Sequence, residues 1–307
     1  MHKLESQTYK SKLQTSSEDF KKNKDSMLGM LQEIDILLDE AEAGGGPDHH
    51  ERLAARGKLP VRERIFHFLD PDSPFLEISG LAGYKSDYPV GGGAVAGVGV
   101  CSGIECIIFA NDPTVLAGAM HFYSVKKWMR AMAIARDCKI PFIQFVESAG
   151  GDLRPRSGQV VGGTTHFAES GRQFYEITEL SKLNIPTVTV TFGTATAGGA
   201  YQPGMSDYNI FVKDQADVAL AGPPLVQMAT GEISSREDIG GAKMHAEKSG
   251  LAEYLAEDDL DGIRIAREVM SHLNWKKEGN LPRFKIKDPL YDQEDLLGIV
   301  EPSLKTP

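Results

Sequence analysis

The sequence is poor in the residues that build disulfide frameworks and metal sites. Its three cysteines, Cys101, Cys106 and Cys138, show no CxxC spacing, and its eight histidines include no HExxH motif. An odd number of cysteines without such spacing predicts neither a set of disulfides nor a zinc centre. We therefore expect no metal site in this chain.

Long apolar runs and an excess of positive charge are also missing. No apolar stretch approaches the roughly 18–20 residues that span a bilayer. The first 20 residues contain neither an apolar signal core nor an arginine, so the sequence predicts a cytoplasmic location. The formal net charge of −10 argues against nucleic acid as the main partner, and no membrane partner is expected.

Positive charge is present only in local clusters. Each cluster fits either a solvated helix face or a site for a small anion, and the sequence alone leaves both open. The clusters are Arg52, Arg56, Lys58, Arg62 and Arg64; Lys126, Lys127 and Arg130; and Arg154 with Arg156.

The first 70 residues predict a disordered leader (1–16) followed by a helical arm (17–70). Apolar residues from Met27 to Ala41 recur at spacings of four, three, four and three, as on one face of a helix. Ser16 followed by Asp19 predicts its N-terminal cap, and the glycines at 44–46 end it. Two shorter helices are expected at 48–56 and 62–69.

A glycine-rich region follows. The segments 94–100 and 104–110 flank Cys101-Ser102-Gly103, which predicts a β-hairpin. The run GVGVCSG does not have the spacing of a dinucleotide-binding loop, and a strand rather than a helix follows it. We therefore interpret this region as a twisted hairpin.

Next, a strand, a loop of small residues and a helix occur three times in succession. The strand–loop pairs are IIFA with NDPTVLAGAM, FIQFV with ESAGGDL, and VTVTF with GTATAGGAY. This alternation predicts an α/β domain with a parallel sheet, in which loops at the carboxyl ends of the strands converge. Backbone N–H groups in two such loops can form an oxyanion hole. The further elements expected are helices at 121–137, 166–183, 225–230, 242–248 and 259–273, and strands at 209–212 and 218–221.

Side chains for acid–base chemistry are few in these loops. The sequence contains no GxxxxGK[ST] phosphate loop and no GxSxG nucleophile elbow. Glu147, Asp152 and His166 lie on or after the second loop and are candidate acid–base groups, although a helix cap or a packing role also fits Asp152 and His166.

Five segments together resemble the carboxyltransferase (beta) subunit of biotin-dependent acyl-CoA carboxylases, of the propionyl-CoA and methylcrotonoyl-CoA type. The likeness runs from about residue 17 to 300 and corresponds to the N-terminal half of such subunits. The segments are ARGKLPVRERI (55–65), GIECIIFANDPTVLAGA (103–119), VKKWMRAMAIA (125–135), TATAGGAYQPGMSD (194–207) and LAGPPLVQMATGE (220–232).

The resemblance implies a crotonase-like spiral of ββα units over residues 71–280, and a linker (281–307) toward a second carboxyltransferase half. It also implies transfer of a carboxyl group from carboxybiotin to the enolate of an acyl-CoA. Biotin would arrive on a carrier domain of a biotin carboxylase or carrier subunit and would itself act as the base, within a homo-oligomer, a hexamer in this family. The chain alone would hold an incomplete active site.

The resemblance places the oxyanion donors at Ala149, Gly150 and Gly151. Together with the basic clusters, it also predicts residues that bind the acyl-CoA. These are Ala117, Gly118, Ala197, Gly198, Gly199, Ala200, Tyr201, Arg56, Lys58, Lys126 and Lys127.

One departure from the family pattern is Asp152, in the loop SAGGDLRPRSGQ. Its charge means either a polar acyl pocket or an ion pair with Arg154 or Arg156. Two other functions stay open at this point: a stand-alone crotonase-like hydratase or thioesterase with Glu147 as acid–base group, and a non-catalytic scaffold that docks a biotin carboxylase subunit.

Overall fold

A mixed β-sheet forms the centre of residues 40–279. The computed structural model describes residues 10–152, 154, 167–277 and 288–301. Within these ranges eight strands form one sheet in the order β1-β2-β3-β4-β5-β6-β8, with β7 paired to β5. The first three strands are antiparallel, and the pairs from β3 onward are parallel. The strands are β1 (Leu76–Glu77), β2 (Ala94–Cys101), β3 (Ile104–Asn111), β4 (Phe142–Ser148), β5 (Thr187–Thr196), β6 (Tyr208–Val212), β7 (Asp217–Ala219) and β8 (Tyr254–Ala256).

The helices connect these strands and extend the chain at both ends. Most of the predicted helices are present within a few residues of the expected bounds. They are α1 (Glu18–Ala43), α2 (Pro47–Ala54), α3 (Val61–Phe68), η1 (Leu116–Gly118), α4 (Phe122–Cys138), α5 (Phe167–Lys182), η3 (Ala197–Ala200), α6 (Tyr201–Gly204), α7 (Pro223–Thr230), α8 (Arg236–Gly240), α9 (Ala242–Met244), η4 (His245–Ser249), α10 (Asp259–His272) and η5 (Gln293–Gly298).

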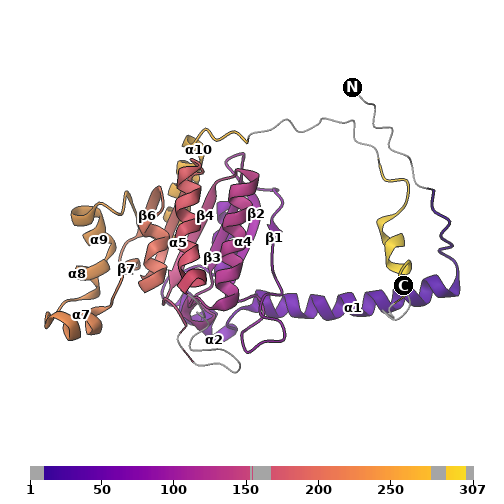
Figure 1. Ribbon diagram of the computed structural model, residues 1–307, viewed down its shortest axis with the longest axis horizontal. Helices are drawn as coiled ribbons and strands as arrows, with labels where there is room; N and C mark the ends of the chain where they lie inside the picture. The colour runs from indigo at the N-terminus through magenta and orange to yellow at the C-terminus, as the bar shows by residue number, and fades with distance from the viewer. Residues whose placement is uncertain (1–9, 153, 155–166, 278–287, 302–307) are drawn as a thin grey trace. The chain divides into compact units, whose positions relative to one another are not determined.

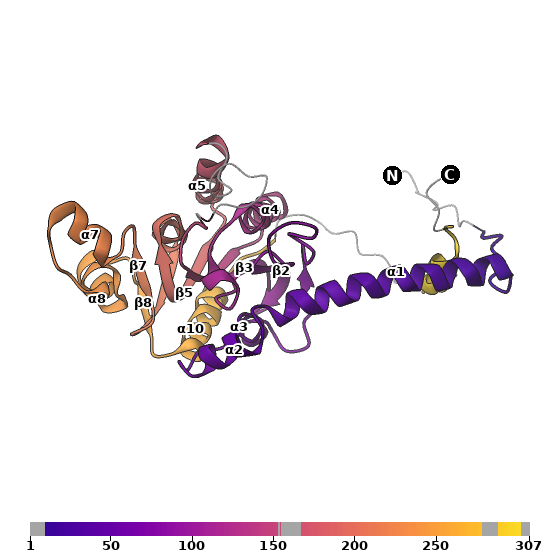
Figure 2. The same cartoon turned by 90° about the horizontal axis from the view of Figure 1, so that it is seen from below.

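Helices cover both faces of the sheet. Figure 2 shows α4 and α5 on one side of the strands and α10 with α3 on the other. Successive residues of a strand point to opposite faces, so a strand buried on both faces tends to be apolar along most of its length. Ile107 of β3 accordingly packs in the core that contains Trp128 of α4, whereas Ile108 packs in the core that contains Phe68 of α3. The apolar run Cys106–Ala110 of β3 follows from this layering (Figure 1).

The predicted hairpin is confirmed. β2 and β3 pair antiparallel from Ala94 opposite Asn111 to Cys101 opposite Ile104. At the turn Ser102 and Gly103 have φ values of +53° and +74°, as a tight two-residue hairpin requires. Both of their N–H groups donate to the carboxylate of Asp70, at 2.8 and 2.7 Å. The glycines of this region therefore serve strand packing and a turn.

The chain divides into two compact units, residues 40–279 and residues 1–39 with 280–307. In the second unit, Ser17 caps α1 by accepting a hydrogen bond from the N–H of Phe20 at 3.2 Å. The predicted cap at Ser16 was wrong by one residue, because a capping side chain reaches the N–H three positions along the chain. Phe20 is buried, and it packs against Gly298.

Other differences from the predicted elements are local. Residues 242–248 form a short α-helix followed by a π-helical turn, and the short elements β1, β8 and α8 were not predicted. Among the described residues, no helix is long and apolar enough to cross a membrane. His166, Arg156, residues 1–9 of the predicted leader and residues 281–287 and 302–307 of the predicted linker lie outside the described residues. The predicted division into domains stays a prediction.

Candidate active site

Three loops of small residues meet at the carboxyl ends of β3, β4 and β5, as the sequence predicted. The N–H of Ala149, after β4, donates to the carbonyl of Ala117, after β3, at 3.1 Å. The N–H of Met120 donates to the carbonyl of Gly150 at 2.8 Å. A side chain on Gly150 would lie 3.0 Å from the carbonyl oxygen of Thr196, at the start of the third loop. The parallel strand order therefore brings the three loops into contact.

Two glycines are required by this close approach. Gly118 has φ +67°, and a Cβ atom there would lie 2.0 Å from the carbonyl oxygen of Glu147. Gly150 has φ +94°, a conformation that side-chain-bearing residues rarely adopt. Only glycine lets the backbones of the first two loops lie this close together.

The N–H groups of the 149–151 loop are not equivalent. Ala149 donates to Ala117, and Gly150 donates to the Oγ of Ser148 at 3.2 Å. Gly151 pairs with Met120 in a parallel bridge whose two hydrogen bonds use the Gly150 carbonyl and the Asp152 N–H. The N–H of Gly151 consequently has no acceptor among the described residues. In the described part of the chain it is therefore the N–H of this loop that has no protein acceptor.

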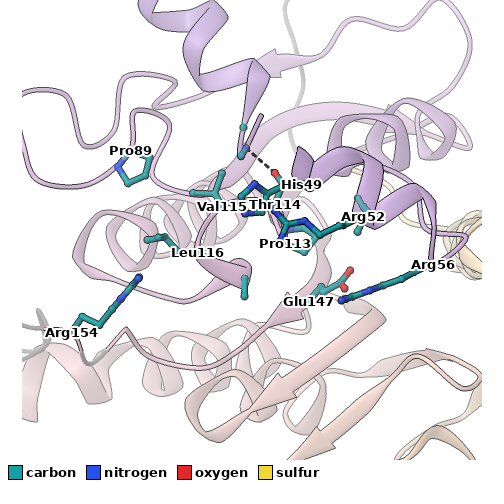
Figure 3. A pocket seen from close by; sticks show the side chains of 14 residues that line it. His49, Arg52, Arg56, Pro89, Pro113, Thr114, Val115, Leu116, Glu147 and Arg154 are labelled. Atoms are coloured by element: carbon teal, nitrogen blue, oxygen red, sulfur yellow. Dashed lines mark hydrogen bonds between the residues drawn. The ribbon is translucent and has the colours of Figure 1, made fainter. Parts of the chain in front are cut away.

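A cavity of about 600 Å³ opens beside the first two loops (Figure 3). Its cationic side chains are Arg52 of α2, Arg56 of the turn after α2, and Arg154 of the segment after β4. Figure 3 shows Arg154 on the opposite side of the cavity from Arg52 and Arg56. Such a lining favours an anionic ligand. The lining residues are Gly44, Gly45, His49, Arg52, Leu53, Arg56, Pro89, Pro113, Thr114, Val115, Leu116, Ala117, Glu147 and Arg154.

Next to this cavity, four charged side chains form a buried network. Lys58 Nζ lies 2.5 Å from Glu147 Oε1, and Arg64 Nη2 lies 2.9 Å from Glu147 Oε2. Arg64 Nε donates to Asp259 Oδ2 at 2.8 Å. The Arg64–Glu147 contact is an ion pair without hydrogen-bond alignment. The four side chains are between 1% and 12% exposed, and two cations balance two anions. Pairing of this kind is required because an isolated buried charge is costly.

The carboxyl transferase domain model matches residues 52–307, which is most of the chain and includes the three loops, the cavity arginines and the network. The chain belongs to the carboxyl transferase domain family. This family membership confirms the resemblance drawn from the sequence.

Relatives of this carboxyltransferase domain are named as beta subunits of acyl-CoA carboxylases. The chain is 49% identical over 282 residues to a probable biotin-dependent acyl-coenzyme A carboxylase beta2 subunit of Mycobacterium tuberculosis, covering 92% of this chain and 52% of the relative. It is 40% identical over 293 residues to the mitochondrial methylcrotonoyl-CoA carboxylase beta chain of Dictyostelium discoideum, covering 94% and 49%.

Solved structures of similar proteins agree with this family assignment. The beta subunit of P. aeruginosa geranyl-CoA carboxylase matches with a TM-score of 0.81 and 40% identity over 95% of this chain and 54% of that one. A transcarboxylase 12S structure, described as a hexamer assembly with methylmalonyl-coenzyme A bound, matches with a TM-score of 0.71 and 26% identity, covering 80% and 48%. The fold is the predicted crotonase-like one. The chain spans about half the length of the relatives it matches.

The carboxyltransferase domain does not bring all the predicted acyl-CoA residues together. Arg56 and Ala117 line the basic cavity, and Gly118 lies beside it in the first loop. Lys126 is exposed, with its ammonium 4.3 Å from the centre of the Phe122 ring. Lys127 is 2% exposed, and its ammonium donates to two backbone carbonyls.

The third loop faces in two directions. A Cβ atom added at Gly199 would lie 3.7 Å from the side chain of Ser148, so this part of the third loop contacts the second loop. Ala200 and Tyr201 instead line a separate and mostly apolar cavity of about 640 Å³ beside β7 and α7. Ala197 has φ +53°, and the Cβ position of Gly198 has no neighbour within 4 Å among the described residues.

Asp152 forms an ion pair, one of the two alternatives left open by the sequence. The carboxylate is buried, and it accepts hydrogen bonds from Arg154 Nε at 2.7 Å and Nη2 at 3.1 Å. This bidentate pairing neutralises the negative charge of Asp152 beside the second loop.

Sequence reasoning missed the roles of Arg64 and Asp259, and it gave Lys58 and Glu147 other roles. Both oxygens of Glu147 contact cations, so neither is left to take a proton from a substrate as the hydratase or thioesterase alternative requires. A possible signal for Arg64 was its place between the apolar Val61 and Ile65 on one short helix, where a charge needs a buried partner.

Proposed function

We propose that this carboxyltransferase domain binds the thioester of an acyl-CoA and stabilises its enolate while a carboxyl group is transferred to it. The observation that carries the proposal is the convergence of the three small-residue loops beside a basic cavity, with the Gly151 N–H unpaired among the described residues. The relatives named as acyl-CoA carboxylase beta subunits support the same function.

The chemical task of the loops is to stabilise negative charge on the thioester oxygen. Removal of a proton alpha to the thioester, or gamma through a conjugated double bond, places that charge on the oxygen. Fixed backbone donors stabilise it, and one lost donor costs about 3–4 kcal/mol of transition-state stabilisation. We assign this role to the 149–151 loop, with Gly151 as the donor, and assign Ala117 and Gly118 to the wall of the acyl site.

Carboxybiotin, delivered by a partner, would supply the carboxyl group and the base. The three loops that meet among the described residues are assigned to one substrate, so we assign no residue of this chain to the biotin ring. A second carboxyltransferase half and a biotin carboxylase or carrier subunit are therefore proposed partners, within a homo-oligomer. The 12S relative is described as a hexamer assembly. The cytoplasmic location remains a prediction.

The CoA phosphates require positive charge that the whole chain, with its net charge of −10, does not supply on average. Arg52 and Arg56 supply it locally, since both side chains are exposed and line the basic cavity. Arg154 is engaged by Asp152, so its net contribution to anion binding is smaller. We propose that Arg52 and Arg56 attract the phosphates.

The experiment that tests this function has two arms. Thermal unfolding is first measured with a panel of acyl-CoA thioesters and with NAD. A ligand at 100 times its dissociation constant stabilises the native state by about 2.7 kcal/mol. We expect stabilisation by the thioesters and none by NAD, and equal shifts with both ligands would contradict the proposal.

The second arm measures carboxyl transfer from carboxybiotin to propionyl-CoA and 3-methylcrotonyl-CoA. The chain is assayed alone and then with the second half of a full-length relative. We expect transfer only in the combined sample. Transfer by the chain alone, above a blank without protein, would contradict the half-site assignment. Hydration or hydrolysis of acyl-CoA without biotin would favour the hydratase or thioesterase alternative instead.

A further inference from the structure

Glu147 lies between the first loop and β5, the strand that leads into the third loop. It immediately precedes the 148–151 loop, and its carbonyl oxygen is the atom against which Gly118 packs. Its side chain fills the space next to Gly193 of β5, where an added Cβ would lie 2.6 Å from Oε1. Glu147 therefore occupies the space between the start of the loop that carries the Gly151 N–H, the first loop and β5.

The strand pairing at Glu147 is irregular. Val146 pairs with Thr191 and Ser148 pairs with Ala195, so the single residue Glu147 lies opposite residues 192–194 of β5. Such a bulge interrupts the hydrogen-bond ladder and changes the direction of the chain. Backbone groups in the interruption need other partners if the loop is to keep one geometry.

Lys58 supplies one such partner, to the backbone carbonyl of Phe192. Its ammonium lies 2.5 Å from Glu147 Oε1 and donates to the Phe192 carbonyl at 2.8 Å, so one cation joins both sides of the bulge. The Lys58 side chain is 9% exposed, and its charge is already paired. A lysine held in this way is poorly placed to bind a CoA phosphate, the role that the basic cluster predicted for it.

Arg64 pairs with the second carboxylate oxygen of Glu147. It contacts Glu147 Oε2 at 2.9 Å and Asp259 Oδ2 at 2.8 Å, and its guanidinium lies 4.2 Å from the centre of the Phe192 ring. Asp259 also accepts the N–H of Leu59 at 3.0 Å, which fixes the segment that carries Lys58. The two cations thus hold Glu147 by both oxygens.

We propose that Lys58 and Arg64 are positioning residues that act through Glu147 to set the geometry of the 149–151 amides. This inference rests on the proposed function, because it assigns those amides to the thioester oxygen. It predicts that breaking the network impairs stabilisation of the charged intermediate while binding of the neutral thioester is retained.

The test compares the full chain with the variants Lys58→Met and Lys58→Met/Glu147→Gln. The double variant removes one cation and one anion and leaves Arg64 paired with Asp259, so it is expected to fold even if the single variant does not. The control is Arg62→Met, which removes a part-buried ion pair with Glu77 from the same helix as Arg64 but outside the basic cavity. Urea unfolding and circular dichroism establish that each variant is folded.

Two measurements are made on each protein. The first is the infrared carbonyl frequency of a bound acyl-CoA labelled with 13C at the thioester, which falls when donors polarise the carbonyl. The second is the affinity for a CoA thioether that carries a nitronate in place of the enolate. A displacement of about 1 Å in such a site costs up to about a hundredfold. In both Lys58 variants we expect the frequency shift to be lost and nitronate affinity to fall by up to that factor, with acyl-CoA affinity unchanged. Arg62→Met should retain all three values.

The possible outcomes separate the two proposals. Failure of the wild-type chain to bind any acyl-CoA would overturn the proposed function and this inference with it. Wild-type binding with a frequency shift that both Lys58 variants retain would overturn the inference alone. Weaker acyl-CoA binding with an intact frequency shift would show that Lys58 binds substrate, which also overturns it.

Discussion

Replacing Lys127 with Met should remove a pH dependence of stability that burial of its ammonium creates. Lys127 lies on α4 and donates to the carbonyls of Gly91 and Ala94 at 3.1 and 2.7 Å. Burial lowers the pKa of Lys127 from 10.5 to about 8, with Glu77 opposing the shift and Arg62 adding to it. No carboxylate forms an ion pair with it among the described residues.

The sign follows from the proton bound in each state. Between pH 8 and 10.5 the unfolded chain keeps a proton on Lys127 that the native protein has released, so the free energy of unfolding rises with pH. The difference of 10.5 − 8, or 2.5 pKa units, at about 1.36 kcal/mol per unit corresponds to about 3 kcal/mol. This contribution is fully present above pH 10.5 and is lost as the pH falls through 8.

Burial of the Cys101 thiol changes the unfolding free energy in the opposite direction over part of the same pH range. Burial raises the pKa of this thiol from 9.0 to about 12, so the unfolded chain releases that proton first and stability falls as the pH rises above 9.0. The effect of Lys127 is therefore measured as the difference between wild type and Lys127→Met, in which the cysteine contribution cancels.

The assay is urea unfolding of both proteins at intervals across this pH window, with Lys126→Met as the exposed control. We expect the difference in unfolding free energy between wild type and Lys127→Met to rise by about 3 kcal/mol. The corresponding difference for Lys126→Met should stay flat. A flat difference for Lys127→Met would mean that its ammonium is solvated or paired in the native protein, which would refute the reasoning.

Three further substitutions test the loops and the cavity. Gly150→Val should displace the neighbouring Gly151 N–H and so lower kcat of the complete enzyme by about 10²–10³-fold, as for loss of one oxyanion donor, with little change in acyl-CoA affinity. A change confined to KM would contradict the loop assignment, and urea unfolding separates this effect from strain at φ +94°. Gly118→Ala places a Cβ 2.0 Å from the Glu147 carbonyl oxygen. It should lower the unfolding free energy by about 1–3 kcal/mol, as overpacking does, whereas Gly198→Ala, at an open position, is its control. Arg56→Ala should weaken acyl-CoA binding while kcat stays unchanged, and the loss should be larger at low salt than at high salt. If binding is equally salt-sensitive with and without Arg56, this arginine does not attract the CoA phosphates.

The sequence allowed prediction of features that depend on neighbouring residues. The hairpin at Ser102-Gly103 and the meeting of the loops at 117–118 and 149–151 follow from local turn chemistry and from the repeated strand–loop–helix order. The basic cluster that includes Arg56 lies within one short segment and was visible in the sequence, which left open whether it is a solvated helix face or an anion site.

Contacts between distant parts of the chain could not be predicted in this way. Lys58 meets Glu147 across 89 positions and Arg64 meets Asp259 across 195, and charge alone does not distinguish such a lysine from a solvated one. Lys126 and Lys127 are adjacent in sequence, yet one is exposed and the other buried, because consecutive helix residues point about 100° apart. The rotation of α4 decides which lysine faces the core.

The bond between the Leu59 N–H and Asp259 spans 200 positions, and this separation sets the order in which the molecule can be completed during synthesis. At about 5–20 residues per second, roughly 10–40 s pass between the addition of the two residues to the nascent chain. Throughout that interval Arg64 lacks its aspartate partner, and the segment carrying Lys58 lacks its anchor. A nascent chain that already contains the three loops therefore does not yet contain the Asp259 contacts of the network. On the positioning role proposed for that network, the geometry of the 149–151 amides is completed only after α10 has been synthesised.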